Sequence, residues 1–314
     1  MPSSKSRLLY LNYFLKNSFF VFRYKLFHIK KSCLRFRGKK GITLEYSNDA
    51  LKSHIESGKP FAAIRFGAVE LGCLNNAKKI ELGFKKTFKP LVRYSMKNNA
   101  GLFPTDDKTL QEYSDLMFQE LPNTDLLGIS GVHMEDYFQR LYCPNADYIQ
   151  YEGMEPLRGD WVKSLKGKRV LVITPFDEDV RSQYQRREKL FLDDPDLLPE
   201  FTLLTLQAPL TLADGESDLP SSIDVLKHLE EQIKALEFDI ALVGAGVYGS
   251  PLCLFIKSMG KQAIQTGGAT STLFGIMGRR WESRPHVSKH VNEYWIHPSV
   301  KPKGYEKVEK GAYW

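Results

Sequence analysis

Arg65 and Glu70 are charged residues at the end of an otherwise apolar stretch, residues 61–71, which reads FAAIRFGAVEL. A guanidinium binds the oxygens of a phosphate or a carboxylate, and a buried charge without such a partner is costly. A carboxylate can take the proton of a reacting hydroxyl or accept hydrogen bonds from sugar hydroxyls. With Gly67 in the turn between them, the two residues predict either a site for a phosphorylated ligand or an internal Arg65–Glu70 ion pair that shapes the turn.

A glycine-rich turn late in the chain, VGAGVYGS, follows one apolar run and begins a helical stretch. Gly244, Gly246 and Gly249 satisfy the pattern G-x-G-x-x-G, in which backbone N–H groups at a helix start hold a phosphate. A dinucleotide site also has an acid at the end of the following strand, and neither Gln265 nor Thr266, which lie near that position, is acidic. The turn therefore predicts a phosphate-holding helix start that includes Ser250. Close packing around the glycines and a nicotinamide site are the alternatives.

Further polar residues follow the other apolar runs. His133, in SGVHMEDYF, is a candidate base, although a lone histidine near acids is more often a loop residue with ordinary hydrogen bonds. Arg186 and Arg187 could reach a diphosphate or lie on the surface. Ligands of open parallel sheets bind at the carboxyl ends of the strands, so these turns predict one polar cleft. That cleft requires the turn at Arg65 and the helix start at Ser250 to face each other.

The elements that would position these residues alternate along the chain. Amphipathic stretches, such as SSIDVLKHLEEQIKALEF with Ser221 or Ser222 at its start, separate short apolar runs. This alternation predicts an α/β fold with a mostly parallel, Rossmann-like sheet and helices on both faces, over residues 45–280. The aromatic tail, residues 281–314, should pack on this body. The predicted strands are 61–67, 126–130, 169–174, 201–207, 239–244 and 262–266.

The first 44 residues form a basic, aromatic arm. Residues 1–40 contain eleven Lys or Arg and no acid, so the rest of the chain carries 7 − 11 = −4 of the total net charge of +7. This composition is typical of a segment in a membrane interface, with rings among the headgroups and cations on anionic lipid. A helix packed on the body and a disordered basic tail are the alternatives. No nucleic-acid partner is predicted, because the body carries no motif that would cooperate with the arm.

The charges of the arm and the spacing of the cysteines indicate the cellular compartment in which the protein is expected. Lys16, Arg23 and Lys25 interrupt the apolar stretch of the arm, which argues against a cleavable signal peptide and a spanning helix. The four cysteines are scattered, without a C-x-x-C pair, which favours a reducing cytosol. We therefore expect a cytoplasmic protein that is peripheral on the inner face of the cell membrane.

The segment IRFGAVEL resembles the R-F-G-D-G-E stretch of glycosyltransferases of GT-D fold, which act in bacterial surface-polysaccharide synthesis. DIALVGAG…PLCLFIKSMGKQAIQTGG is similar to that family's last strand–turn–helix–strand unit, and TPFDEDVRSQYQRREKLF resembles a segment of polysaccharide-biosynthesis proteins. The resemblance spans roughly residues 45–280 and implies a nucleotide-sugar donor, a UDP-sugar first of all, and a glycan or lipid-linked acceptor. In the family, the D-G-E carboxylates lie at the nucleotide-sugar and metal site. Ala68 and Val69 replace the first carboxylate and the second glycine here, which leaves open whether Mg²⁺ or Mn²⁺ takes part.

Three functions follow from these residues. The first is a glycosyltransferase, the second a non-catalytic degenerate transferase that assists glycan assembly, and the third a nicotinamide-dependent oxidoreductase. For the first, the predicted catalytic residues are Glu70 and His133. The predicted nucleotide-sugar-binding residues are Arg65, Gly67, Ser130, Gln183, Arg187, Gly244, Gly246, Ser250, Gly267 and Thr270.

Overall fold

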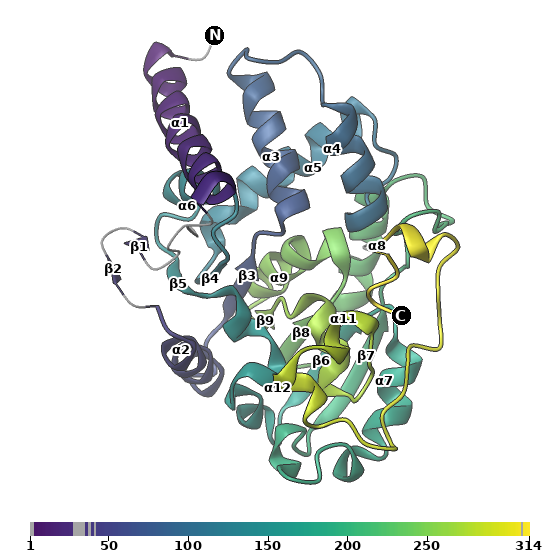
Figure 1. The fold of residues 1–314 in the computed structure, drawn as a ribbon. Helices are drawn as coiled ribbons and strands as arrows, with labels where there is room; N and C mark the ends of the chain where they lie inside the picture. Colours follow the sequence, from purple (N-terminus) through teal and green to yellow (C-terminus); the bar gives the residue numbers. More distant parts are fainter. Residues whose placement is uncertain (1–2, 28–34, 37–38, 41, 309) are drawn as a thin grey trace.

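The computed structural model describes residues 3–27, 35–36, 39–40, 42–308 and 310–314. These residues form an α/β fold around a seven-stranded sheet of order β5-β4-β3-β9-β8-β6-β7, in which all neighbouring strands run parallel (Figure 1). The predicted fold class is therefore confirmed. The strands of this sheet are β3 (Phe61–Arg65), β4 (Leu126–Ile129), β5 (Asp147–Gln150), β6 (Arg169–Thr174), β7 (Thr202–Gln207), β8 (Ile240–Val243) and β9 (Gln262–Ile264).

Helices cover both faces of the sheet, and alternate residues of each strand point to opposite faces. In β3, Ala62 and Ile64 join the core beneath α3, α5 and α9, whereas Phe61 and Ala63 join the core beneath α2. All five residues of β3 are buried, which explains why its sequence is a continuous apolar run. The helices are α1 (Ser4–Phe27), α2 (Leu44–Glu56), α3 (Ala68–Glu81), α4 (Pro90–Ser95), α5 (Asp107–Glu120), α6 (Glu135–Tyr142), α7 (Asp177–Tyr184), α8 (Ser222–Lys234), α9 (Gly249–Ser258), α10 (Thr270–Leu273), α11 (Arg279–Glu282) and α12 (Pro285–Ser288).

The sequence predicts six of the seven strands and misses β5. That strand reads DYIQ and lies at the edge of the sheet, with only Tyr148 and Ile149 buried, so its apolar signal is short. The predicted helix after residue 220 is α8, where the Ser221 side chain accepts a hydrogen bond from the backbone N–H of Asp224 at 3.2 Å. This cap satisfies a donor that the first turn of a helix leaves free.

The arm and the tail both contact the body. Helix α1 packs against α3 and α6, and a two-stranded antiparallel hairpin, β1 (Arg35–Phe36) and β2 (Lys39–Lys40), lies between α1 and α2 in the chain. In the tail, Trp281, Trp295 and Trp314 are buried in the core on the α2 side of the sheet. Among the residues that the structure describes, no helix combines the length and the apolar character needed to cross a membrane.

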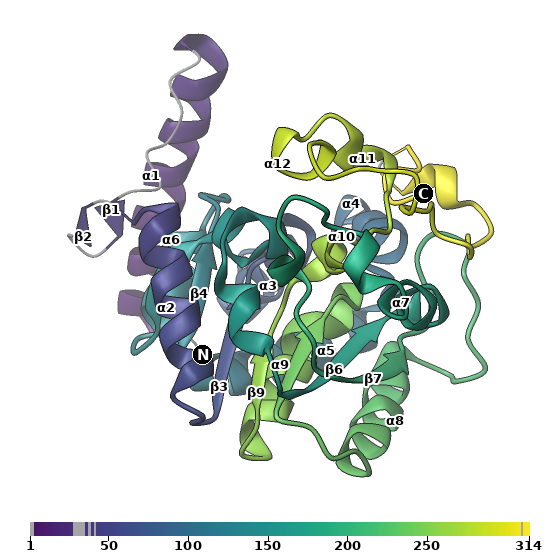
Figure 2. The same ribbon diagram turned by 90° about the horizontal axis from the view of Figure 1, so that it is seen from below.

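Because the strands are parallel, their carboxyl ends meet at one edge of the sheet. Figure 2 shows this edge beneath α11, α12 and the end of the tail. The turns that the sequence singles out follow the strands at this same edge.

Candidate functional site

A cavity of about 300 Å³ lies at the carboxyl edge of the sheet. Its lining residues come from the ends of β3, β5, β6, β7, β8 and β9, together with the C-terminal tail. Of the predicted site residues, the cavity brings together Arg65, Gly67, Glu70, Gly244, Gly246, Gly267 and Thr270. The turn after β3 and the glycine-rich turn after β8 therefore face one cavity, as the sequence interpretation requires.

Gln265 connects these two turns. Its side-chain Oε1 accepts a hydrogen bond from the backbone N–H of Arg65 at 2.9 Å and another from the Ser250 hydroxyl at 2.9 Å. Gln265 follows β9, which pairs with β3 on one side and β8 on the other. Gln265 lies near the position where a dinucleotide site has its acid, but it is uncharged. Through these two hydrogen bonds it holds the start of α9 against the turn after β3. Ser250 is buried and contributes to the cavity through this contact rather than as part of its lining.

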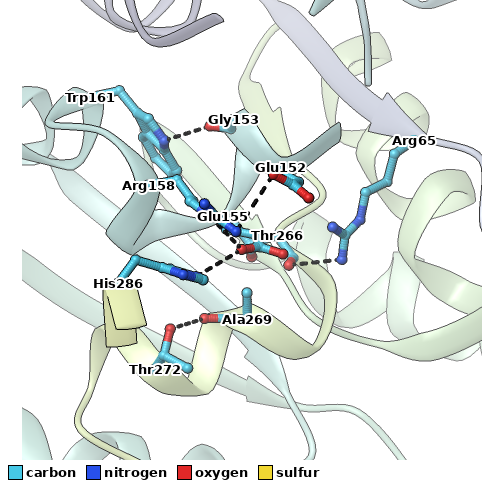
Figure 3. Close-up of polar contacts among 10 residues, drawn as sticks. All are labelled: Arg65, Glu152, Gly153, Glu155, Arg158, Trp161, Thr266, Ala269, Thr272 and His286. Atoms are coloured by element: carbon cyan, nitrogen blue, oxygen red, sulfur yellow. Dashed lines mark hydrogen bonds and ion pairs between the residues drawn. The ribbon is translucent and has the colours of Figure 1, made fainter. Parts of the chain in front are cut away.

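Arg65 is a buried cation on the cavity wall, with only 8% of its surface exposed. Its Nη2 donates to the Thr266 carbonyl at 3.1 Å (Figure 3), and its guanidinium lies 4.1 Å from the centre of the Tyr151 ring. Among the described contacts, the guanidinium forms no ion pair with a carboxylate, and its buried Nη1 has no hydrogen-bond partner. The contacts described for this part of the chain do not include the Arg65–Glu70 ion pair considered above. The free N–H groups are suited to an anion that enters the cavity.

Two glycines make room for this arginine. Gly267 has a φ of +58°, and a Cβ at this position would overlap Nη2 of Arg65. A side chain there would be strained by its backbone and would displace the guanidinium. A Cβ at Gly244 would overlap Oγ1 of Thr270 and would lie 2.6 Å from the Gly267 carbonyl. The two turns are therefore packed backbone to backbone behind Arg65.

The remaining glycines of the G-x-G-x-x-G pattern also have packing roles. Gly246 has a φ of +53°, and a Cβ there would lie 2.9 Å from the Ala100 carbonyl. A Cβ at Gly249 would lie 2.9 Å from the Gln265 side chain. Close packing, which the sequence leaves as an alternative, therefore accounts for these glycines, while Gly244 and Gly246 also line the cavity.

Glu70 lies in the first turn of α3, three residues after the N-cap Gly67. Its carboxylate folds back over Gly67, where it would overlap a Cβ. Negative charge is favourable at a helix N-terminus, so the start of α3 favours this carboxylate at the cavity wall. Behind it, the pKa of Cys73 is raised to about 12, chiefly by burial and to a smaller extent by the charge of Glu70. Cys73 is therefore a protonated, structural thiol.

The C-terminal tail contributes three cavity residues that sequence reasoning misses. Arg280, at the start of α11, stacks its guanidinium over the Tyr313 ring at 4.9 Å and donates to the Tyr313 hydroxyl. Trp314 lies beside Tyr313 with an edge-to-face contact. All three line the cavity. Their aromatic and cationic types are a usable signal, because Arg and aromatic side chains form platforms for planar rings.

Four predicted residues lie elsewhere. His133 makes an edge contact with Phe14 of α1, at 5.6 Å between ring centres, so the structure places this candidate base outside the cavity. Ser130 lines a neighbouring pocket that shares Tyr151 with the cavity. The backbone N–H of Ser130 donates to Glu135 at 3.1 Å. These residues follow β4, whose end is turned towards α1 and α6.

Gln183 and Arg187 also lie outside the cavity. The Gln183 amide is buried and donates to the carbonyls of Gly275 and Tyr294, at 3.2 and 3.0 Å, which ties α7 to the tail. Arg187 forms ion pairs with Glu188 and Glu200, both largely exposed. Gln183 lies in α7 and Arg187 follows this helix, so both residues lie away from the cavity at the strand ends.

The described side chains that line the cavity do not form a binding site for a metal ion. Glu70 is the only acidic residue among the described residues that line the cavity, and Ala68 is exposed beside it. Within the described ranges, no group of three or more His, Cys, Asp or Glu could hold a metal ion. A divalent cation bound through protein ligands alone does not fit these residues.

Comparisons with known proteins add little to this geometry. No family model matches the sequence, and no curated protein matches it. A solved structure described as "The highly conserved domain of unknown function 1792 has a distinct glycosyltransferase fold" is similar, with a TM-score of 0.44 and 11% identity over 85% of this chain and 98% of that chain. At this score and identity, the activity of that protein does not transfer to this chain.

Proposed function

We propose that this chain is a glycosyltransferase that transfers a sugar from a nucleotide sugar to a glycan or lipid-linked acceptor in surface-polysaccharide synthesis. UDP-sugars are the first donors to test. The observation that carries the proposal is the buried guanidinium of Arg65, which lines a cavity at the strand ends with one N–H nitrogen unpartnered among the described residues. Glu70 and the tail aromatics line the same cavity.

The diphosphate of the donor would lie between the turn after β3 and the turn after β9. Charge builds up on the diphosphate as the sugar leaves, and a fixed positive group stabilises that charge. Arg65 is held for this role by Gly267, Thr266 and Tyr151, so little reorganisation accompanies the reaction. The stacked Arg280 and Tyr313 offer a second cation and a ring face at the other side of the cavity.

Glu70 would act on the acceptor. Its carboxylate takes the proton of the acceptor hydroxyl as the acceptor oxygen bonds to the anomeric carbon. The bond between that carbon and the diphosphate breaks, and the electron pair leaves with the nucleoside diphosphate. A hydrogen bond from a sugar or ribose hydroxyl to Glu70 is the alternative role. No step requires a metal, although a diphosphate could bring Mg²⁺ or Mn²⁺ with it.

A degenerate, non-catalytic transferase is the second candidate, because Ala68 occupies the place of the family carboxylate at the start of α3. A nicotinamide enzyme is less well supported, since Gln265 is engaged with Arg65 and Ser250 where a ribose-binding acid would be needed.

A donor screen separates these functions. Purified protein is heated with each common nucleotide sugar, with UDP and with NADH, in the presence and absence of Mn²⁺. A ligand at about 100 times its Kd stabilises the folded state by about 2.7 kcal/mol, which is measurable as a shift in Tm. We expect stabilisation by a nucleotide sugar and none by NADH. Stabilisation by NADH alone would refute the proposal. Donor binding without release of nucleoside diphosphate, with or without glycan acceptors, would favour the degenerate transferase.

A further inference from the structure

Within the part of the chain that the structure describes, the last third of α1 exposes large apolar side chains. Phe19, Phe22 and Phe27 are 57%, 57% and 60% exposed, and Leu26 is 57% exposed. Contiguous apolar surface of this kind on a soluble fold marks an interaction site. We name residues 19–27 of α1 the projecting end.

The earlier part of α1 fixes the direction of this end. Tyr10 is buried and donates to Asn75 of α3 at 2.6 Å. Asn17 is also buried: its amide donates to Asp136 of α6 at 2.8 Å and accepts from the backbone N–H of Met134 at 3.1 Å. Arg7 donates to the Leu82 carbonyl at 2.9 Å. These specific contacts hold the helix on the body, so the exposure of the projecting end is a property of the fold.

The charges of the arm have one sign. Arg23 and Lys25 lie within the projecting end, and Lys5, Arg7 and Lys16 precede them on α1. The sequence contains no acid before Glu45. The Arg23 guanidinium lies 5.8 Å from the centre of the Phe19 ring, so cation and ring share one surface. Aromatic rings interspersed with Lys and Arg complement an anionic lipid surface. A second copy that docked through its own projecting end would bring the same positive charges to the contact and would be repelled.

The projecting end lies on the functional side of the molecule. Figure 2 shows α1 extending beyond the body on the side where the strands of the sheet end and where the tail lies. The cavity is at these strand ends. A membrane in contact with the projecting end would therefore face the side of the molecule that carries the cavity.

We propose that residues 19–27 of α1 dock on a membrane surface that contains anionic lipid, with the apolar rings among the headgroups and Arg23 and Lys25 on the lipid phosphates. This docking does not depend on the proposed transferase activity, although it would bring a lipid-linked acceptor to the cavity. It is peripheral binding by one face and end of a helix, without insertion across the bilayer.

The test is co-sedimentation of the full chain with vesicles of phosphatidylcholine alone or of phosphatidylcholine mixed with phosphatidylglycerol. We expect binding to the mixed vesicles that weakens as salt is raised, and much weaker binding to the neutral ones. Arg23→Glu with Lys25→Glu should reduce the partition coefficient by at least about 25-fold, from roughly fivefold for each lost charge. The triple variant Phe19→Ser, Phe22→Ser, Phe27→Ser should bind neither type of vesicle.

Matched controls change the same residue types elsewhere. Lys52→Glu with Lys227→Glu makes the same change in net charge on exposed residues of α2 and α8 and should bind like wild type. Leu91→Ser with Leu192→Ser removes two other exposed apolar side chains and should also bind like wild type. Unfolding temperature and UDP binding without vesicles, measured for every variant, separate loss of docking from loss of folding or of donor binding.

Three outcomes would overturn the proposal. One is wild-type protein that ignores anionic vesicles. Another is equal vesicle binding by the wild type and the triple serine variant. The last is self-association, seen by sedimentation equilibrium, that disappears in the triple serine variant while no vesicle binding is found, which would assign the projecting end to a second copy.

Discussion

Replacing Arg65 by methionine tests the reading of the cavity as an anion site. Methionine retains an unbranched stem that can pack beside Tyr151, but it removes the guanidinium, whose buried Nη1 has no hydrogen-bond partner among the described residues. If Arg65 serves stability, this change should unfold the protein. If Arg65 instead binds a phosphorylated ligand, the change should abolish ligand binding and leave the stability of the ligand-free protein nearly unchanged.

The magnitudes separate these two cases. A hydrogen bond between a charged donor and its partner contributes about 1.5–3 kcal/mol, so UDP binding should weaken by about 10- to 150-fold. In the absence of ligand, Arg65→Met loses the bond to the Thr266 carbonyl and the contact with the Tyr151 ring, each worth about 1 kcal/mol. It also removes a buried charge whose desolvation costs several kcal/mol. The free energy of unfolding should therefore fall by no more than about 2 kcal/mol, because the relief of this desolvation offsets the lost contacts.

The assay is isothermal titration of UDP into wild type and variants, together with urea unfolding. Arg187→Met is the matched control, because Arg187 pairs with surface carboxylates and lies away from the cavity. It should bind UDP as wild type does. Wild-type UDP affinity in Arg65→Met, or equal loss of affinity in both variants, would refute the role of Arg65.

Three further predictions concern other residues. Glu70→Gln should abolish sugar transfer while it leaves Tm and UDP affinity nearly unchanged; product release at the wild-type rate would remove Glu70 from the mechanism. Gly267→Val should weaken UDP binding as Arg65→Met does, because its side chain overlaps the guanidinium, and should cost about 1–2 kcal/mol of stability from its positive φ; an unchanged titration would show that the position of the guanidinium is unimportant. Burial, followed by the charge of Arg158, lowers the pKa of His286, which lies 3.1 Å from Glu155 (Figure 3). Since the unfolded chain then takes up the proton at higher pH, stability should fall as pH drops through about 6.5, and less steeply in His286→Gln. Identical pH profiles in thermal unfolding would contradict this assignment.

Local sequence patterns predict most of the sheet. Apolar runs such as 169–174 identify strands because both faces of the sheet are covered, and the parallel arrangement follows from the alternation with helices. The strand order is not readable in the same way. The position of β9 between β3 and β8 depends on pairing between residues about 200 positions apart, such as Ala63 and Ile264. That neighbour relation is what brings Gln265 to Arg65.

The site is predicted less completely than the fold. A strand end fixes where a turn begins but not the direction that it takes, so Gly67 and Gly267 reach the cavity whereas His133 contacts α1. Arg280 and Tyr313 come from the tail, whose path over the sheet edge is set by long-range packing of its tryptophans. Short motifs carry no information about such contacts.

In the proposed function, the cavity holds a nucleoside diphosphate against Arg65. A crystal structure of the protein with UDP tests it most directly. We expect a diphosphate oxygen within about 3 Å of Nη1 of Arg65, in the space between the turns that contain Gly67 and Gly267. UDP bound at another site, with Arg65 making no contact to it, would rule out this role of the cavity.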